Sequence, residues 1–278
     1  MRECVPMKEM KIKANGLKFK VLIEGTGAPV LLLHGFPDSA KLWKHLTPYL
    51  VSAGYKVIAP DQRGYGESDA PEDVASYRTN SILADAVAIL KELGYESGVR
   101  LVGHDWGALV GWLLCLQHPD IFQRYVAVSV GHPLAYRCAG IEQKLKAWYV
   151  LAFQIPGFAE WMLSANNYAR LRKMAGSAEE RQQRVEEFSR PGRLSAALNW
   201  YRANFSQLGF SRFEKSKVPT LGVYSTGDIA LTEKQMTDSE KYMDAEWRYR
   251  RIEGTSSHWI PLDQAEELAR LICEWFAL

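Results

Sequence analysis

The sequence predicts an α/β protein in which helices flank a mostly parallel, eight-stranded sheet and a helical cap is inserted. Strand-like and helix-like segments alternate up to about Leu134, which is typical of a parallel sheet with helices on both faces. Residues 135–212 are helical and rich in aromatic residues, with no convincing strand, and strand signals return after them. We therefore expect a core domain of residues 1–134 and 213–278 and a cap domain of residues 135–212.

The eight strands are predicted from apolar runs and turn signals. Lys8 to Lys13 and Lys18 to Glu24 flank Asn15-Gly16, a dipeptide that strongly favours a tight hairpin. The wholly apolar run Pro29 to Leu33 suits a central strand that is covered on both faces. The other predicted strands are residues 55–59, 99–102, 125–130, 220–224 and 247–250.

Helical spacing of apolar residues predicts the remaining elements of the core domain. The predicted helices are residues 41–52, 81–93, 106–117 and 262–276. A helical block inserted between strands of one open sheet would lie over the carboxyl ends of those strands, which is where such sheets bind ligands. We therefore expect the cap to cover a binding site.

Composition excludes several classes of protein. The chain has 278 residues, a formal net charge of +2 and four scattered cysteines without a CxxC pair. These values argue against a nucleic-acid partner, a disulfide framework and a metal site. Residues 1–13 lack the apolar core of a secretory signal, and no stretch approaches about 20 apolar residues. We expect a cytoplasmic protein with no membrane partner, and the sequence leaves a homodimer open.

The most informative motif is Gly103-His104-Asp105-Trp106-Gly107, which follows a predicted strand and precedes a predicted helix. Glycines two positions before and after a central residue allow a strained tight turn that exposes the central side chain above the sheet. Asp105 could then act as a carboxylate nucleophile. Taken alone, the motif is as well explained by Asp105 as a helix N-cap.

Two later strand ends favour the catalytic interpretation. Tyr224-Ser225-Thr226-Gly227-Asp228 ends one strand, and His258 follows the last strand. Singly, Asp228 would be read as a turn residue and His258 as a structural histidine. Together they follow Asp105 in the order nucleophile, acid, base, each after a strand. We therefore predict Asp105, Asp228 and His258 as a catalytic triad.

These motifs resemble those of the α/β-hydrolase superfamily and, within it, the epoxide hydrolases of the soluble type. The resemblance covers residues 15–278, and its strongest pieces are His34-Gly35-Phe36-Pro37, the run from Asp61 to Ser68, and the nucleophile turn. It implies that the backbone N–H groups of Phe36 and Trp106 form an oxyanion hole. We interpret His34 and His104 as structural residues beside the site.

The resemblance also assigns two tyrosines in the cap. In epoxide hydrolases, a pair of cap tyrosines donates hydrogen bonds to the epoxide oxygen. Here Tyr149 and Tyr201 stand in segments that look like the two that carry this pair. The resemblance therefore implies attack of Asp105 on an epoxide carbon, hydrolysis of the resulting ester by water that His258 and Asp228 activate, and no cofactor. Phe36, Trp106, Tyr149 and Tyr201 are the expected substrate-binding residues.

Two other functions stay open. A haloalkane or haloacid dehalogenase would use the same aspartate chemistry, but haloalkane dehalogenases commonly carry asparagine where this chain has Phe36. Fluoroacetate dehalogenases carry arginine where it has Trp106. A non-catalytic ligand-binding member of the fold is the remote alternative, against which the intact triad argues.

The cap composition suggests a small apolar epoxide as the substrate. The residues behind this expectation are Trp148, Phe153, Phe158, Trp161 and Met162. The sequence does not divide them between a substrate site and the cap's own core.

Overall fold

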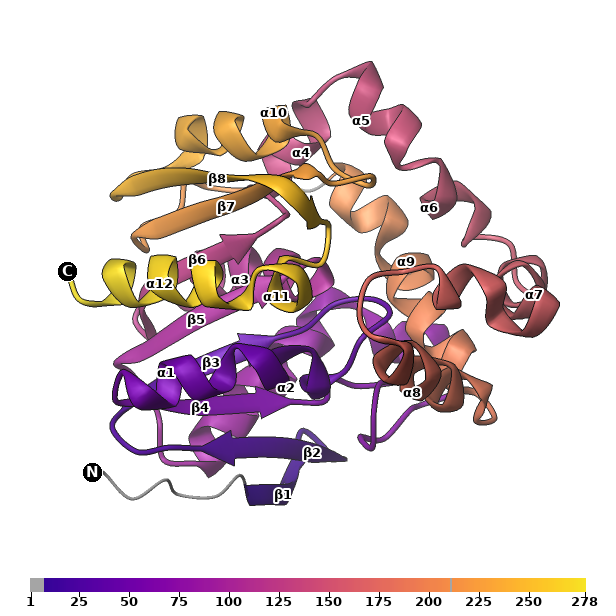
Figure 1. The fold of residues 1–278 in the computed structure, drawn as a ribbon, viewed down its shortest axis with the longest axis horizontal. Coiled ribbons are helices and arrows are strands. Elements are labelled where there is room, and N and C mark those ends of the chain that lie inside the picture. Colours follow the sequence, from indigo (N-terminus) through magenta and orange to yellow (C-terminus); the bar gives the residue numbers. More distant parts are fainter. Residues whose placement is uncertain (1–7, 211) are drawn as a thin grey trace.

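A computed structural model describes residues 8–210 and 212–278, so residues 1–7 of the expected core domain and residue 211 of the expected cap lie outside the described residues. Its centre is an eight-stranded sheet with the order β1-β2-β4-β3-β5-β6-β7-β8 (Figure 1). The strands are β1 (Lys8–Ala14), β2 (Leu17–Glu24), β3 (Ala28–Leu33), β4 (Tyr55–Pro60), β5 (Val99–His104), β6 (Phe122–Val128), β7 (Thr220–Gly227) and β8 (Trp247–Ser257).

The sheet is mostly parallel, as predicted. Only β1 with β2 and β2 with β4 pair antiparallel, and every pair from β4 to β8 is parallel. Asn15 and Gly16 form the hairpin turn with φ values of 48° and 78°, the left-handed conformation that a tight two-residue turn requires. The predicted hairpin is therefore confirmed.

Helices cover both faces of the sheet. Along β3, Leu31 and Leu33 pack into one buried apolar cluster, whereas Val30 and Leu32 pack into the other. The first cluster is covered by α2 (Thr79–Glu92) and α3 (Trp106–Gln117), and the second by α1 (Thr47–Ser52) and α12 (Ala265–Phe276). This double burial explains why β3 is apolar at every position.

The strand order reverses between β3 and β5. After β3 the chain adds β4 on one side, and it then returns to add β5 on the other side, so β3 lies between β4 and β5. Leu33 pairs with Gly103 at the carboxyl ends of β3 and β5, which brings the turns that follow these two strands next to each other. Open α/β sheets bind ligands at such a reversal.

The described part of the segment between β6 and β7 contains six helices. They are α4 (Pro133–Cys138), α5 (Ile141–Lys146), α6 (Trp148–Ala152), α7 (Phe158–Arg172), α8 (Ala178–Ser189) and α9 (Arg193–Phe210). Figure 1 shows α5 to α9 beyond the arrowheads of β4 and β8, at the carboxyl-end side of the sheet. We refer to this helical segment as the cap. Between β7 and β8 lie α10 (Glu233–Thr237) and the short 3-10 helix η3 (Asp238–Tyr242), which we had not predicted.

Two predicted helices are divided in the structure. Residues 41–52 form the 3-10 helix η1 (Ala40–His45) and then α1, which has Pro48 in its first turn, where a missing N–H is tolerated. Residues 262–276 form α11 (Ile260–Asp263) and α12, separated at Gln264, whose φ of −139° is not helical. A second 3-10 helix, η2 (Val74–Tyr77), precedes α2, and β6 begins three residues before its predicted start.

Candidate active site

Asp105 lies on a sharp turn between β5 and α3. Its φ of 52° is in the left-handed region, where a residue other than glycine is strained. A Cβ atom at Gly103 would meet the carbonyl group of Gly107, and one at Gly107 would meet the carbonyl group of Leu33. The Asp105 side chain makes no hydrogen bond that caps α3. Asp105 therefore stands at the N-cap position of α3 without capping the helix through its side chain, and the turn presents the carboxylate above the sheet.

Two backbone N–H groups hold this carboxylate. The N–H of Phe36 donates to Oδ1 of Asp105 over 2.8 Å, and the N–H of Trp106 donates to the same carboxylate. Gly35 makes this approach possible, because a Cβ atom there would collide with the Asp105 side chain. The two donors predicted for an oxyanion hole thus converge on Asp105.

His258 lies between two carboxylates. Its Nδ1 is 2.7 Å from Oδ2 of Asp228, and its Nε2 is 3.6 Å from Oδ2 of Asp105. Asp228 is held in turn, because its Oδ1 accepts hydrogen bonds from the N–H groups of Ala230 and Leu231 at 2.8 Å and 2.9 Å. The structure therefore brings Asp105, His258 and Asp228 together from the ends of β5, β8 and β7.

Burial and charge set the protonation of this group. Burial alone would lower the pKa of His258, but the charges of Asp228 and Asp105 and their hydrogen bonds outweigh it and raise that pKa to about 10. Burial alone would raise the pKa of Asp105, but the contact with His258 outweighs it and lowers that pKa. At neutral pH the unliganded site therefore contains an ionised Asp105 beside a protonated His258.

The two predicted tyrosines lie together, Tyr149 on α6 and Tyr201 on α9. Their ring centroids are 6.3 Å apart, and the ring of Tyr201 is 5.1 Å from that of Trp106. The Trp106 side chain hydrogen-bonds the Tyr201 hydroxyl group. Burial raises the pKa of both tyrosines well above 10, and the charge of Asp105 adds to this. Both hydroxyl groups are therefore protonated at neutral pH and able to donate hydrogen bonds.

Aromatic rings surround this group of residues. Phe153 contacts Tyr149, Tyr201 and Phe36, with ring centroids 5.4, 4.9 and 5.8 Å apart respectively. Phe188 of α8 lies 5.8 Å from Phe36. The structure thus divides the cap residues that the sequence left unassigned. Phe153 and Met162 are buried, whereas Trp148, Phe158 and Trp161 are exposed.

The two histidines interpreted as structural have partners that support this interpretation. His34 accepts a hydrogen bond from the N–H of Gln62 at one ring nitrogen and contacts the Gly35 carbonyl oxygen with the other. His104 donates from Nε2 to the carbonyl oxygen of His258 over 2.9 Å. Burial lowers the pKa of both histidines, that of His104 to about 4, so both rings are neutral.

Sequence reasoning missed two residues that hold His258 and Asp228 in place. The Ser129 hydroxyl group donates to the carbonyl oxygen of His258 over 3.1 Å, so the backbone of His258 is held by side chains from the ends of β5 and β6. Lys146 of α5 donates to the carbonyl oxygens of Asp228 and Leu231, both over 2.9 Å, and so connects the cap to the acid loop. No local motif marks these residues, because their partners are more than 80 positions away in the sequence.

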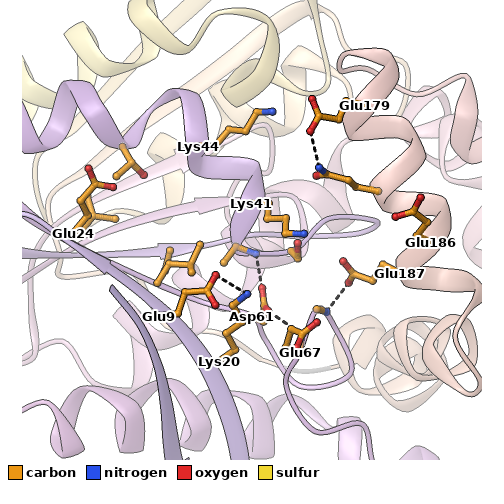
Figure 2. Close-up of a pocket in the computed structure, with 18 of the residues that line it drawn as sticks. Glu9, Lys20, Glu24, Lys41, Lys44, Asp61, Glu67, Glu179, Glu186 and Glu187 are labelled. Atoms are coloured by element: carbon orange, nitrogen blue, oxygen red, sulfur yellow. Dashed lines mark hydrogen bonds and ion pairs between the residues drawn. The ribbon is translucent and has the colours of Figure 1, made fainter. Parts of the chain in front are cut away.

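A cavity of about 490 Å³ lies elsewhere, between the β1, β2 and β4 strands, η1 and α8 (Figure 2). Its lining is mainly charged and does not include Asp105, Tyr149 or His258. Figure 2 shows Glu187 extending from α8 toward the loop that carries Glu67. We call this charged boundary between the core and the cap the charged seam. Its charged lining does not suit an apolar substrate. The described residues contain no group of three or more His, Cys, Asp or Glu that could hold a metal ion.

Comparisons with known proteins show the family of this chain. The family described as "alpha/beta hydrolase fold" matches residues 28–265. The chain is 34% identical to epoxide hydrolase 4 of Mus musculus over 95% of this chain and 77% of that protein. It is 31% identical to epoxide hydrolase A of Mycobacterium tuberculosis over 96% of both chains. The crystal structure of epoxide hydrolase A from Mycobacterium thermoresistibile is similar with a TM-score of 0.81, 28% identity and 98% coverage of both chains.

The chain therefore belongs to the α/β-hydrolase family and is a hydrolase. Within that family it belongs with the epoxide hydrolases, as these relatives show. Among the described residues, no helix is both long enough and apolar enough to span a lipid bilayer.

Proposed function

We propose that this enzyme converts a small apolar epoxide and water into a vicinal diol through an ester on Asp105. One observation carries the proposal. Asp105, on a strained turn and without a capping role, lies 3.6 Å from His258, while the cap tyrosine Tyr201 packs against the adjacent Trp106. The family membership and the aromatic surroundings support an apolar epoxide as the substrate. The scheme uses only side chains and backbone of this chain, without a cofactor.

In the first step, an oxygen of the Asp105 carboxylate attacks one epoxide carbon and the carbon–oxygen bond of the ring breaks. Tyr149 and Tyr201 hydrogen-bond the ring oxygen and supply the proton that it takes up as it leaves. Their raised pKa values suit this role, because the proton stays on the phenol until the strongly basic alkoxide forms. The product of this step is an alkyl ester of Asp105.

Ester formation also changes the state of the base. It removes the negative charge of Asp105, which is one of the causes that raise the pKa of His258. The pKa of His258 therefore falls in the intermediate, and the proton that it loses balances the one that the tyrosines gave to the ring oxygen. A neutral His258, oriented by Asp228, then becomes available as a general base.

In the second step, His258 takes a proton from water while the water oxygen attacks the Asp105 carboxyl carbon. The N–H groups of Phe36 and Trp106 stabilise the negative charge that develops on the carboxyl oxygen. Collapse of this intermediate breaks the ester bond. The leaving alkoxide takes the proton from His258, and the diol departs. The Asp105 carboxyl group then passes its proton to His258, which restores the ionised Asp105 and the protonated His258.

A single turnover in oxygen-18 water tests this scheme. We expect the label in the Asp105 carboxylate and none in the diol, measured by mass spectrometry of both. Label that enters the diol directly in that turnover would rule out the covalent route. In a second arm, His258→Gln should let the ester accumulate as a mass adduct on the peptide that contains Asp105.

A panel of aryl, alkyl and fatty epoxides with chiral analysis of the diols would define the substrate. The dehalogenase alternative is tested in the same assay with matched alkyl halides. Halide release faster than diol formation would favour a dehalogenase and contradict the proposal.

A further inference from the structure

The outer surface of the cap carries an unusual number of exposed apolar side chains. Seven of the twelve large apolar residues that are exposed among the described residues lie within residues 141–161, and six of these seven are between 54% and 70% exposed. We call these six the cap stripe. It consists of Ile141, Leu145, Trp148, Leu151, Ile155 and Trp161.

The cap stripe follows three consecutive helices. Its members are spaced three or four residues apart from Ile141 to Ile155. Two of them lie on α5, two on α6, Ile155 in the turn before α7, and Trp161 on α7. Figure 1 shows α5, α6 and α7 following one another along the outer edge of the cap. On α6, Tyr149 belongs to the active site, whereas Trp148 and Leu151 are exposed. This short helix therefore borders both the active site and the cap surface.

Exposed apolar side chains that gather on consecutive elements in this way are typical of an interaction site. The composition of the cap stripe restricts the partner. Two tryptophans among aliphatic residues are typical of a helix that lies in the boundary between lipid headgroups and acyl chains, where the apolar ring is buried and the indole N–H remains solvated.

The charges beside the cap stripe are mainly positive. From Arg137 to Lys173 the chain has six basic and two acidic residues, a net charge of +4, whereas the whole chain has +2. One of the two acids, Glu160, is already paired with Arg202 at 2.9 Å. Lys144 and Lys173 are exposed within this segment. Such a surface complements anionic headgroups, whereas a two-fold dimer through it would bring like charges together.

We infer that the cap stripe binds the surface of an anionic lipid membrane, with Leu145, Trp148 and Trp161 entering the headgroup layer. Membrane binding itself requires no catalytic step. Its benefit to the enzyme would be access to apolar epoxides dissolved in lipid, and this part rests on the proposed function. This revises the expectation of no membrane partner, which depended on the small net charge of the whole chain and on the lack of a spanning segment.

Flotation with lipid vesicles tests the inference. The whole protein is mixed with vesicles of equimolar phosphatidylcholine and phosphatidylglycerol, or of phosphatidylcholine alone, and the bound fraction is measured. We expect binding to the anionic vesicles that weakens with added salt. The double variant Leu145→Ser/Trp161→Ser should bind at least about tenfold more weakly, because each apolar side chain withdrawn from lipid lowers the affinity.

Tyr49→Ser is the matched control, since Tyr49 is an exposed aromatic residue on α1, outside the cap. It should bind vesicles like the wild type. Three outcomes would overturn the inference: no binding to anionic vesicles, equal binding to phosphatidylcholine alone, or equal binding by the double variant. Self-association that depends on the cap stripe, seen by sedimentation velocity without vesicle binding, would assign the surface to a second copy of the chain.

Hydrolysis of a water-soluble epoxide in buffer separates this inference from the proposed function. The double variant should keep that activity, which also shows that it folds. An enzyme without epoxide activity that still binds anionic vesicles would contradict the proposed function only. An active enzyme that does not bind them would contradict only the inference about the cap stripe.

Discussion

Asp105 and Asp228 both face His258, and their two negative charges act on the same imidazole. Nδ1 faces Asp228 at 2.7 Å, and Nε2 faces Asp105 at 3.6 Å. Of the two, only Asp105 forms a covalent ester in the proposed cycle, whereas Asp228 is buried and holds two backbone N–H partners. In the proposed cycle, ester formation on Asp105 makes His258 available as a base, and Asp228 maintains the orientation of the His258 ring.

Asp228→Asn tests the role of the second carboxylate. The amide oxygen would take the two backbone N–H donors and leave the NH₂ group facing His258 Nδ1, which favours the wrong tautomer. We expect hydrolysis of the Asp105 ester to slow by on the order of 10³–10⁴, as measured by rapid quench and mass spectrometry. Because a charge that raises the pKa of His258 is removed, the remaining rate should reach its plateau at lower pH.

Asp120→Asn, at an exposed position, is the control for this substitution and should behave like the wild type. Ester hydrolysis at the wild-type rate in Asp228→Asn would show that Asp228 does not orient the base.

At the scale of elements, the turn from β5 into α3 depends on close contacts of the backbone. Gly107 lies against the Leu33 carbonyl group of β3, and Gly103 lies against the backbone at Gly107 and Ala108. The same contacts bring β3 and β5 close enough for the Phe36 N–H to reach Asp105. The glycines therefore shape both the strained turn and the pair of N–H donors.

Gly107→Ala tests this contact. The added methyl group would press on the Leu33 carbonyl group, and overpacking of this kind destabilises a protein by about 1–3 kcal/mol. We expect a lower melting temperature in calorimetry and a loss of activity greater than the loss of folded protein, because the Phe36 N–H moves away from Asp105. Gly94→Ala is a useful comparison, since its Cβ would meet no atom and only its φ of 82° is strained. Equal activity per folded molecule in both variants would contradict the proposed role.

At the scale of the whole molecule, the core and the cap meet along a charged seam. Glu187 of α8 accepts a hydrogen bond from the Gly66 N–H at 2.5 Å, and Arg190 donates to the Gly66 carbonyl oxygen at 2.5 Å. Burial, followed by the charge of Asp61, raises the pKa of Glu187 from its ordinary value of 4.5 to about 7. Ionisation of Glu187 therefore works against the closed contact between core and cap.

This seam predicts a pH dependence of stability. Because the pKa of Glu187 is higher in the folded than in the unfolded state, the folded state holds the extra proton between about pH 4.5 and 7. The stabilisation of the folded state by protonated Glu187 is fully present below the pKa of this group in the unfolded state. It is lost as the pH rises through the pKa of the group in the folded state. Glu187→Gln keeps the acceptor for Gly66 and does not titrate.

We therefore compare the melting temperatures of Glu187→Gln and wild type. The difference, variant minus wild type, should rise by a few °C between pH 5 and pH 8, which corresponds to a change in stability on the order of 1 kcal/mol in a protein of this size. Scanning calorimetry at the two pH values measures it. Glu186→Gln changes an exposed neighbour in the same cavity lining and should show no such difference. A constant difference for Glu187→Gln would contradict the prediction.

The sequence by itself determined the order of the strands along the chain and the residues of the triad. Local physics explains this: an apolar run such as residues 29–33 is stable only as a buried strand, and a glycine two positions on each side of Asp105 permits the strained turn. The two cap tyrosines were also named, although only through the resemblance to a family. Helix boundaries were less well predicted where a single residue, such as Pro48 or Gln264, divides one apolar pattern into two helices.

Only the tertiary structure decided which residues act across long distances in the chain. Ser129 and Lys146 support the triad through hydrogen bonds to backbone oxygens 129 and 82 or 85 positions away, and no local pattern encodes such contacts. It also separated the buried Phe153 from the exposed Trp148, which share one apolar cap sequence. Both side chains are hydrophobic enough to be buried, but the packing of the whole cap decides which of them is buried inside the molecule.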